Sequence, residues 1–340
     1  MPLQVARKIS EMGLFRPSLW LRVKLRPLKV HPNTGAHLSP RLGQYFTSSD
    51  KVIDSLIEAA DIKSTDTVLE VGCGSGNITM KLLPLAKKVV SIEIDARFAE
   101  ETRERAAAAG YNNLHVIQGD AVRVEYPPFD VCVANPPFNI STPLIFRLVA
   151  HKPAWRRTVM ILQKEVANRL LADPGNSEYS RLSVNTSLFV RAEKIARVSG
   201  GAFYPQSSVQ STILRLVPRY PQPLFDFLEW DGLIKVCFRE RRRCLNAAFN
   251  KRHVISMLEA NYKTWCSLTR TPPSLLCFPD YLQSTLEELN IERVPAVKLP
   301  AESLQRLLDD FHRKGIFFVN VGNGSVDTPS FEPVDDVVYY

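Results

Sequence analysis

The stretch Thr67-Val68-Leu69-Glu70-Val71-Gly72-Cys73-Gly74-Ser75-Gly76 decides the fold of this chain. Its first half is a short apolar run with one acid, which predicts a buried strand. The strand leads directly into a G-x-G-x-G turn, and residues 77–85 predict a helix. A strand, a glycine-rich turn and a helix in this order are typical of the nucleotide-binding turn of a doubly wound α/β sheet.

Acidic residues follow the next two predicted strands. The strand at 88–92 ends in Glu93, seventeen residues after Gly76, and an acid there can accept both hydroxyls of a ribose. The strand at 114–117 is followed by Asp120, which can accept from the amine of an adenine. A dinucleotide site has the fingerprint G-x-G-x-x-G, whereas here the third glycine comes one residue early. The spacing therefore favours S-adenosylmethionine over a dinucleotide as the bound cofactor.

A fourth predicted strand, 129–134, leads into Asn135-Pro136-Pro137-Phe138. The Asn amide offers a carbonyl oxygen, the prolines leave carbonyls without a competing N–H, and the Phe offers a flat face. These groups suit a planar ring that carries an amine. All four strand ends lie where open α/β sheets bind ligands.

The chemistry of such a site follows from its weak nucleophile, an adenine amine whose lone pair is delocalised into the ring. Acceptors for both amine hydrogens, Asn135 Oδ1 and the Pro136 carbonyl, favour the pyramidal form that attacks a methyl donor. Positioning and electrostatics carry most of this effect. Phe138 would stack on the base. The alternative interpretation is a Pro-rich turn after a strand, with Phe138 in the core.

Composition limits the class of protein and its partners. The chain has 340 residues, enough for two domains, and a net charge of +8 with a pI near 9.2, which suggests an acidic partner such as nucleic acid. No apolar run approaches the length of a membrane span, so no membrane partner is expected. The six cysteines include no C-x-x-C pair. They predict reduced, mostly buried thiols of an intracellular protein, without a disulfide framework or a metal site.

Shifts in composition predict the domain organisation. Residues 1–42 hold eight Lys and Arg against one acid, which predicts a basic extension that is either a transit peptide or an RNA-binding arm. The first interpretation favours the mitochondrion, and the nucleus or nucleolus is the alternative. A proline-rich stretch marks the end of a sheet domain at 43–220. A smaller helical domain at 221–320 and an acidic tail at 321–340 complete the chain.

The helical domain carries the densest basic cluster outside the N-terminal extension. Its members are Arg239, Arg241, Arg242, Arg243, Lys251 and Arg252. A charge run is often only a solvated face, but basic residues that share one face contact phosphates. Together with the basic net charge, the cluster predicts an RNA-binding surface.

These motifs together resemble the ribosomal RNA adenine dimethyltransferases, closest to the eukaryotic type that modifies small-subunit RNA. The resemblance spans about residues 43–318, with specific stretches at 66–72, 130–136, 174–185 and 229–233. It implies a Rossmann-like class I S-adenosylmethionine-dependent methyltransferase sheet with a small C-terminal helical domain. It also implies dimethylation of two adjacent adenosines in a hairpin near the 3′ end of small-subunit rRNA, within ribosome biogenesis.

The resemblance also implies site residues and partners. The implied cofactor residues are Tyr45, Thr47, Gly72, Gly74, Glu93, Asp120 and Asn135. The implied residues of the methyl-transfer site are Asn135, Pro136, Phe138 and Phe203, with Phe203 as a second aromatic wall for a flipped base. The expected partners are small-subunit rRNA and the pre-ribosomal small subunit with its proteins. The free protein is expected to be monomeric.

Several positions depart from the family pattern. Tyr45 stands where the family usually has His, and N-P-P-F replaces N-L-P-Y or N-I-P-Y. Ser207 and Gln210 replace a proline and an acid. These departures keep open a second class of function, an assembly factor that binds small-subunit rRNA with weak or absent methyl transfer. A third and less favoured alternative is a mitochondrial transcription partner built on the same fold.

Overall fold

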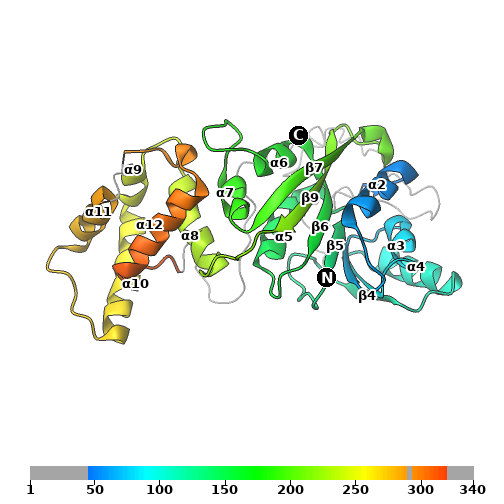
Figure 1. The fold of residues 1–340 in the computed structure, drawn as a ribbon, viewed down its shortest axis with the longest axis horizontal. Helices are drawn as coiled ribbons and strands as arrows, with labels where there is room; N and C mark the ends of the chain where they lie inside the picture. Colours follow the sequence, from blue (N-terminus) through cyan, green and yellow to red (C-terminus); the bar gives the residue numbers. More distant parts are fainter. Residues whose placement is uncertain (1–44, 289–292, 320–340) are drawn as a thin grey trace, which may run out of the picture. The chain divides into compact units, whose positions relative to one another are not determined.

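The structure, a computed structural model, describes residues 45–288 and 293–319, which belong to one compact unit of the chain. Figure 1 shows a sheet flanked by helices, followed in the chain by a further group of helices. The predicted α/β class is confirmed. The predictions for residues 1–42 and 321–340 lie outside the described residues, and the domain boundary near residue 220 stays a prediction.

Seven strands form one sheet in the order β4-β3-β2-β5-β6-β9-β7. They are β2 (Thr67–Val71), β3 (Lys88–Glu93), β4 (Leu114–Gln118), β5 (Val131–Ala134), β6 (Arg157–Gln163), β7 (Val190–Val198) and β9 (Ser211–Pro218). The first five in the order are parallel, and β9 pairs antiparallel with both β6 and β7. The chain runs from β2 out to β4 and then returns to β5 on the other side of β2. This reversal makes the carboxyl ends of β2 and β5 the switch point at which doubly wound sheets bind ligands.

Helices cover both faces of the sheet, because successive residues of a strand point to opposite sides and both sides here are apolar. These helices are α2 (Asp50–Ala60), α3 (Asn77–Leu82), α4 (Ala96–Ala108), α5 (Ser141–Ala150), α6 (Lys164–Leu170) and α7 (Arg181–Ser187). On β5, Val131 and Val133 share a core cluster with α2 and α3, whereas Cys132 and Ala134 share one with α5. The helix α3 ends at Leu82, earlier than the predicted residue 85, because Pro84 has no N–H with which to continue the helical hydrogen bonds.

A second, two-stranded sheet joins two segments that are distant in the sequence. β1 (Phe46–Thr47) pairs antiparallel with β8 (Phe203–Tyr204), and Ser48 N–H donates to the Ala202 carbonyl at 3.0 Å. No sequence pattern predicts this pairing, since two-residue strands have no measurable periodicity. The pairing holds residues 45–47 beside the carboxyl ends of β2 and β5.

The remaining described helices follow the sheet in the chain. They are α8 (Phe227–Phe238), α9 (Leu245–Phe249), α10 (Arg252–Thr269), α11 (Phe278–Glu288) and α12 (Ala301–Arg313), with a 3₁₀ turn η5 (Ala296–Lys298) before α12. Trp230, Phe249 and Phe311 are fully buried among these helices, in a core that is continuous with the apolar face of the sheet beneath α5 and α7. None of the described helices is long and apolar enough to cross a membrane.

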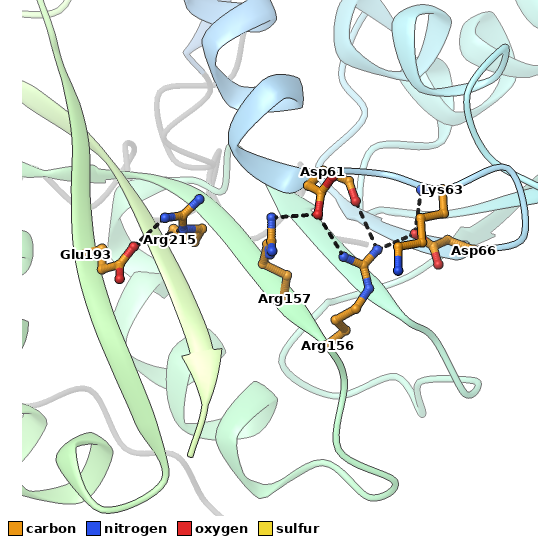
Figure 2. Close-up of polar contacts among 7 residues, drawn as sticks. All are labelled: Asp61, Lys63, Asp66, Arg156, Arg157, Glu193 and Arg215. Carbon is orange, nitrogen blue, oxygen red and sulfur yellow. Dashed lines mark hydrogen bonds and ion pairs between the residues drawn. The ribbon is translucent and has the colours of Figure 1, made fainter. Parts of the chain in front are cut away.

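Ion pairs connect residues at the amino ends of the strands, which is the end of the sheet opposite to the switch point (Figure 2). Arg156, just before β6, contacts Asp66, just before β2, with 2.5 Å between Nη2 and Oδ2. The same guanidinium lies 3.5 Å from Asp61 Oδ2, and the neighbouring Arg157 contacts that oxygen at 3.0 Å. This network therefore joins the start of β6 to the end of α2 and the start of β2.

Candidate active site

The turn after β2 depends on glycine at two positions. Gly74 has φ of +51°, and a Cβ there would lie 2.5 Å from Cε1 of Phe46. Gly72 has φ of +81°, and a Cβ there would lie 3.4 Å from the carbonyl oxygen of Asn135. Glycine adopts such angles without a steric penalty and lets neighbouring groups approach the backbone. The turn is thereby packed between β1 and the N-P-P-F segment.

Groups from β3 and α4 hold this turn in place. Thr102 Oγ1 donates to the Gly74 carbonyl at 2.9 Å. Arg105 Nη1 donates to the Ser75 carbonyl at 2.8 Å. The Gly74 N–H in turn donates to Glu93 Oε2 at 3.0 Å. The backbone of the turn is therefore fixed by the protein itself, which reduces the cost of ordering it when a ligand binds.

Glu93 is buried at the end of β3, with 6% of its surface exposed. Its Oε2 accepts from the Gly74 N–H and its Oε1 accepts from the Asp95 N–H, both at 3.0 Å. Burial raises the pKa of Glu93, and these two backbone hydrogen bonds act in the opposite direction. Because each carboxylate oxygen can accept two hydrogen bonds, Glu93 retains acceptor capacity for a pair of hydroxyls.

Asn135 follows β5 directly and has a fixed side-chain orientation. Its Nδ2 donates to the backbone carbonyl of Tyr45 at 3.0 Å. Since a carbonyl oxygen can only accept, the amide nitrogen must face it, and Oδ1 points away as an acceptor. The residue that the sequence assigns to amine recognition is therefore oriented by a segment that lies 90 positions earlier in the chain.

A cavity of about 240 Å³ lies at this edge of the sheet. Its lining includes all seven residues assigned to the cofactor, namely Tyr45, Thr47, Gly72, Gly74, Glu93, Asp120 and Asn135. Sequence reasoning missed other lining residues, among them Phe46, Ile94, Phe98, Asn139 and Ile140. Ile94 carried a usable signal in the sequence, because it is an apolar residue that directly follows the strand-end acid Glu93. In the structure its side chain is 46% exposed. The structure thus brings the assigned residues together, while their binding roles stay predictions.

The groups around the cavity fit S-adenosylmethionine. Thr47 is only 3% exposed, and its Oγ1 has no hydrogen-bond partner among the described residues, so a polar ligand group would satisfy it. The carboxylate of Glu93 suits the ribose hydroxyls. The apolar side chains of Ile94 and Ile140 suit the flat faces of an adenine.

Asp120 lines the cavity, but its carboxylate already has protein partners. Oδ1 accepts from the Val122 N–H at 2.9 Å, a contact typical of an aspartate that shapes its own turn. Oδ2 lies 3.5 Å from Nε of Arg123. The predicted contact between Asp120 and an adenine amine would use the remaining acceptor positions.

The aromatic residues assigned to the target base do not form two parallel walls. The rings of Phe138 and Phe203 have centroids 6.5 Å apart and planes at 80°, and Tyr45 stacks on Phe138 at 5.5 Å and 23°. Phe203 is 3% exposed within a core cluster. The lining of the cavity includes neither of these phenylalanines, nor Pro136, among the described residues. A base that stacks on Phe138 therefore has to displace the Tyr45 ring or use the opposite face of Phe138.

A second buried acid, Glu70, lies on β2 beneath the glycine-rich turn. It is 1% exposed, and its Oε2 accepts from Thr79 Oγ1 of α3 at 2.7 Å. Its Oε1 has no hydrogen-bond partner within the described part of the chain. Burial raises the pKa of Glu70 to about 7, and the carboxylate of Glu93 acts in the same direction. Sequence reasoning treated Glu70 only as a strand residue, so this acid that titrates near neutral pH was missed.

The basic cluster predicted to bind RNA lies after α8, and its members have different surroundings. Arg241 is half-buried, and its Nη1 donates to the Tyr179 carbonyl at 2.7 Å, which is an internal contact. Lys251 and Arg243 pair with Glu240 at 2.9 Å and 3.2 Å. The exposed members are Arg239, Arg242, Arg243 and Arg252. These four present charge to the solvent, whereas Arg241 is committed to the fold.

Cysteines and metal ligands were also considered in the sequence. Four of the six cysteines are buried, so the predicted mostly buried placement is confirmed, and their reduced state stays a prediction. Within residues 45–288 and 293–319, no three His, Cys, Asp or Glu side chains are grouped so that they could hold a metal ion.

The family model and the similar proteins all describe the same kind of enzyme. The profile of a family described as ribosomal RNA adenine dimethylase matches residues 35–271. A protein of Dictyostelium discoideum, described as a probable dimethyladenosine transferase, is 42% identical over 280 residues, which cover 81% of this chain and 89% of that protein. A dimethyladenosine transferase of Schizosaccharomyces pombe is 35% identical over 288 residues, which cover 84% of this chain and 94% of the relative.

Solved structures show the same architecture. The crystal structure of a dimethyladenosine transferase from Plasmodium falciparum has a TM-score of 0.75 at 44% identity, and the match covers 80% of this chain and 99% of the other. The 23S rRNA methyltransferase ErmE has a TM-score of 0.52 at 24% identity over 78% of this chain and 99% of its own. The second likeness supports the fold alone, and the sheet is that of a class I methyltransferase.

Proposed function

Because the chain belongs to the ribosomal RNA adenine dimethylase family, we propose that it dimethylates N6 of two adjacent adenosines in the 3′-terminal hairpin of small-subunit rRNA. Adenine dimethylation of ribosomal RNA is the activity of this family, and the fold and family imply S-adenosylmethionine as its methyl donor. The proposed setting is small-subunit assembly, with the pre-ribosomal small subunit as the form in which the RNA is met.

The cofactor would occupy the cavity at the switch point. When bound there, S-adenosylmethionine supplies an electrophilic methyl group. Glu93 would accept the ribose hydroxyls with the lone pairs that Gly74 and Asp95 leave unused. The Thr47 hydroxyl, buried and without a partner among the described residues, would bind a polar group of the donor. The turn at Gly72 would bring the backbone against it.

A single observation carries the proposed mechanism. The Asn135 amide is held by the Tyr45 carbonyl so that Oδ1 is left as an acceptor beside the cavity. An acceptor at this place binds one hydrogen of the adenine amine and favours the pyramidal form, in which the lone pair is localised on the nitrogen. The Pro136 carbonyl is the proposed acceptor for the other hydrogen. Both groups act by position and partial charge, without a strong base.

The target adenine has to leave its helix or loop stack before its amine can reach this site. We assign the half-buried Phe138 ring to stacking on the base, through the face that the stacked ring of Tyr45 does not cover. Stacking on an aromatic side chain offsets part of the unstacking cost, by about 1–3 kcal/mol per base. Phe203 meets Phe138 edge-on and supports that ring from the side.

The exposed arginines after α8 would contact the phosphates of the same RNA. Their charge is independent of base sequence, so they contribute affinity, and the pocket contributes the choice of base. For the location we propose the mitochondrion, on the composition of residues 1–42, with the nucleus or nucleolus as the alternative.

The decisive experiment is transfer of label from S-adenosylmethionine to immature small ribosomal subunits, followed by nucleoside analysis. Mitochondrial and cytosolic subunits are tested side by side with the wild-type chain and Asn135→Ala. The control is Asn112→Ala, because Asn112 is exposed and does not line the cavity. Dimethyladenosine on one kind of subunit, lost in Asn135→Ala and kept in Asn112→Ala, supports the proposal and identifies the compartment. Absence of label on both, with RNA binding intact, supports the assembly-factor alternative.

A further inference from the structure

Residues 174–185 form most of the connection between α6 and α7 and the start of α7, and they also contact the helices that follow the sheet. They form one of the family-like stretches of the sequence, yet the proposed reaction assigns them no part. The Tyr179 hydroxyl donates to the Leu299 carbonyl at 2.9 Å, just before α12. In the other direction, Arg241 Nη1 donates to the Tyr179 carbonyl at 2.7 Å. This stretch is therefore a physical connection between the sheet and the helical part.

An ion pair between α7 and α8 is the most directional of these contacts. Arg181 Nε donates to Asp231 Oδ1 at 2.8 Å, and its Nη2 donates to Oδ2 at 2.7 Å. The two side chains are 19% and 10% exposed. Asn185 Nδ2 donates to the same carboxylate, and Lys235 Nζ lies 3.4 Å from it. A guanidinium fork that engages both oxygens of a carboxylate fixes direction as well as distance.

Both partners are anchored in their own elements. The Arg181 guanidinium lies 5.2 Å from the centre of the Phe146 ring of α5, and the next residue, Leu182, is buried in the core under the sheet. Asp231 follows Trp230, whose indole is fully buried among the helices. A change in the pair would therefore be transmitted to both sides instead of being absorbed by mobile side chains.

The pair lies on a continuous path between the active-site edge and the basic cluster. Ser183 Oγ donates to the Arg169 carbonyl of α6, the helix that directly follows the carboxyl end of β6. On the other side, Arg239 comes eight residues after Asp231 at the end of α8, which is about 12 Å along an α-helix. Arg239, one of the exposed arginines, is thus about two helical turns from Asp231, and α6 connects the pair to the carboxyl end of β6.

We propose that Arg181 and Asp231 are positioning residues that set the exposed arginines at a fixed distance and angle from the candidate active site. The inference rests on the proposed function, because it requires one RNA to contact both places. Apolar packing between α7 and α8 stabilises the contact but is not directional. A buried ion pair adds little net stability compared with apolar residues of similar size. Orientation is what this pair adds to the interface.

The experiment compares two ion pairs of similar type. The tested variants are Arg181→Lys and Asp231→Asn. The controls are Arg215→Lys and Glu193→Gln, which change a pair between β9 and β7 (Figure 2), where two guanidinium nitrogens contact one carboxylate oxygen. That pair lies wholly within the sheet, so its loss cannot reorient the helical part.

Each full-length variant is measured for unfolding temperature, for S-adenosylmethionine affinity by calorimetry, and for kcat and KM with immature small subunits. We expect Arg181→Lys and Asp231→Asn to raise the KM for RNA about tenfold, with kcat and cofactor affinity unchanged within about twofold, because substrate placement and not chemistry is affected. The control variants should lower the unfolding temperature without raising the KM.

The inference is overturned if the Arg181 and Asp231 variants raise the KM no more than the controls do at an equal loss of unfolding temperature. A fall in kcat with unchanged KM also overturns it. A wild-type chain without methyl transfer contradicts the proposed function and not this inference. In that case the dissociation constant for a small-subunit hairpin RNA, from fluorescence anisotropy, replaces the KM. A tenfold loss of RNA affinity in the Arg181 and Asp231 variants relative to the controls then supports the positioning role. Equal RNA affinity in the variants and the controls contradicts it.

Discussion

The side-chain nitrogen of Asn135 lies 3.0 Å from the backbone carbonyl oxygen of Tyr45 and donates to it. This contact joins the N-P-P-F segment to β1, and both residues line the cofactor cavity. The group proposed to accept the target amine is thus oriented by a wall of the cofactor site. We therefore expect orientation of the acceptor and occupancy of the cavity to be coupled through this hydrogen bond.

Replacing Asn135 by Asp tests that coupling. A carboxylate keeps an acceptor toward the target amine but has no hydrogen for the Tyr45 carbonyl, so two oxygens would face each other at the former contact. We expect kcat to fall at least as far as in Asn135→Ala, by about 10²-fold or more, with RNA affinity unchanged. Single-turnover methyl transfer measures this. If Asn135→Asp retains clearly more activity than Asn135→Ala, the Tyr45 contact has no role in catalysis.

Replacing Gly74 by Ala tests the packing of the glycine-rich turn. The positive φ costs Ala about 1 kcal/mol, and the added Cβ would also meet the Phe46 ring at 2.5 Å. Gly110→Ala is the matched control, because Gly110 has φ of +81° with no atom within 4 Å of the added Cβ. We expect both variants to lose stability in urea unfolding, and only Gly74→Ala to bind S-adenosylmethionine about tenfold more weakly. Equal cofactor affinity in the two variants would contradict this account.

Glu70 predicts a pH dependence of stability. Burial raises its pKa from the usual 4.5 to about 7, so the folded state holds the proton more tightly than the unfolded chain does. Its stabilising contribution is complete below about pH 4.5 and is lost as the pH rises through about 7, an effect of about 3 kcal/mol at most. Glu70→Gln cannot ionise and keeps an acceptor for Thr79. The unfolding free energy of the wild type should therefore fall relative to Glu70→Gln between about pH 5 and pH 8.

Urea unfolding at a series of pH values checks this prediction. Glu100, which is exposed and pairs with Arg103 at 2.8 Å, provides the control in Glu100→Gln. The control variant should follow the wild type across the range. Parallel curves for the wild type and Glu70→Gln would show that Glu70 ionises at its ordinary pKa in the folded protein.

Adjacent arginines before β6 test the ion pairs of Figure 2. Arg156 faces Asp66, whose side chain is 7% exposed, whereas Arg157 faces Asp61, whose side chain is 57% exposed. Arg156→Ala should lower the unfolding free energy by about 1–3 kcal/mol, because it leaves a buried carboxylate with one partner fewer. Arg157→Ala should lower it by less than about 1 kcal/mol. Because both lie at the edge opposite to the cavity, cofactor affinity should be unchanged, and equal losses of stability would refute the argument from burial.

The sheet and its ligand edge could be predicted because local sequence carries their signals. Each of β2, β3, β4 and β5 is an apolar run that ends in a polar or glycine-rich element. Because the strands of such a sheet are parallel, these ends were expected to lie together on one side of it. Gly72, Glu93 and Asn135 lie around one cavity for that reason. Tyr45 and Thr47 were assigned only through the family resemblance, since nothing in their own neighbourhood points to a ligand.

Contacts that depend on distant pairing could not be predicted. The β1–β8 pair has two residues on each side, too few for any period, and the stacking of Tyr45 on Phe138 follows from it. The basic run after α8 was interpreted by charge alone, although Arg241 contacts Tyr179 inside the fold. Charge in a sequence does not distinguish a residue that faces solvent from one that satisfies a buried carbonyl.

The pairing of β1 with β8 has a consequence for biosynthesis. During translation, residues 45–47 emerge early, but their partner strand Phe203–Tyr204 is made only after β2 to β6. A nascent chain that stops before β8 would already possess the glycine-rich turn, Glu93 and Asn135, yet it would lack the strand that holds the cavity wall. High affinity for the methyl donor should therefore arise late on the ribosome, so that an incomplete chain cannot sequester the cofactor.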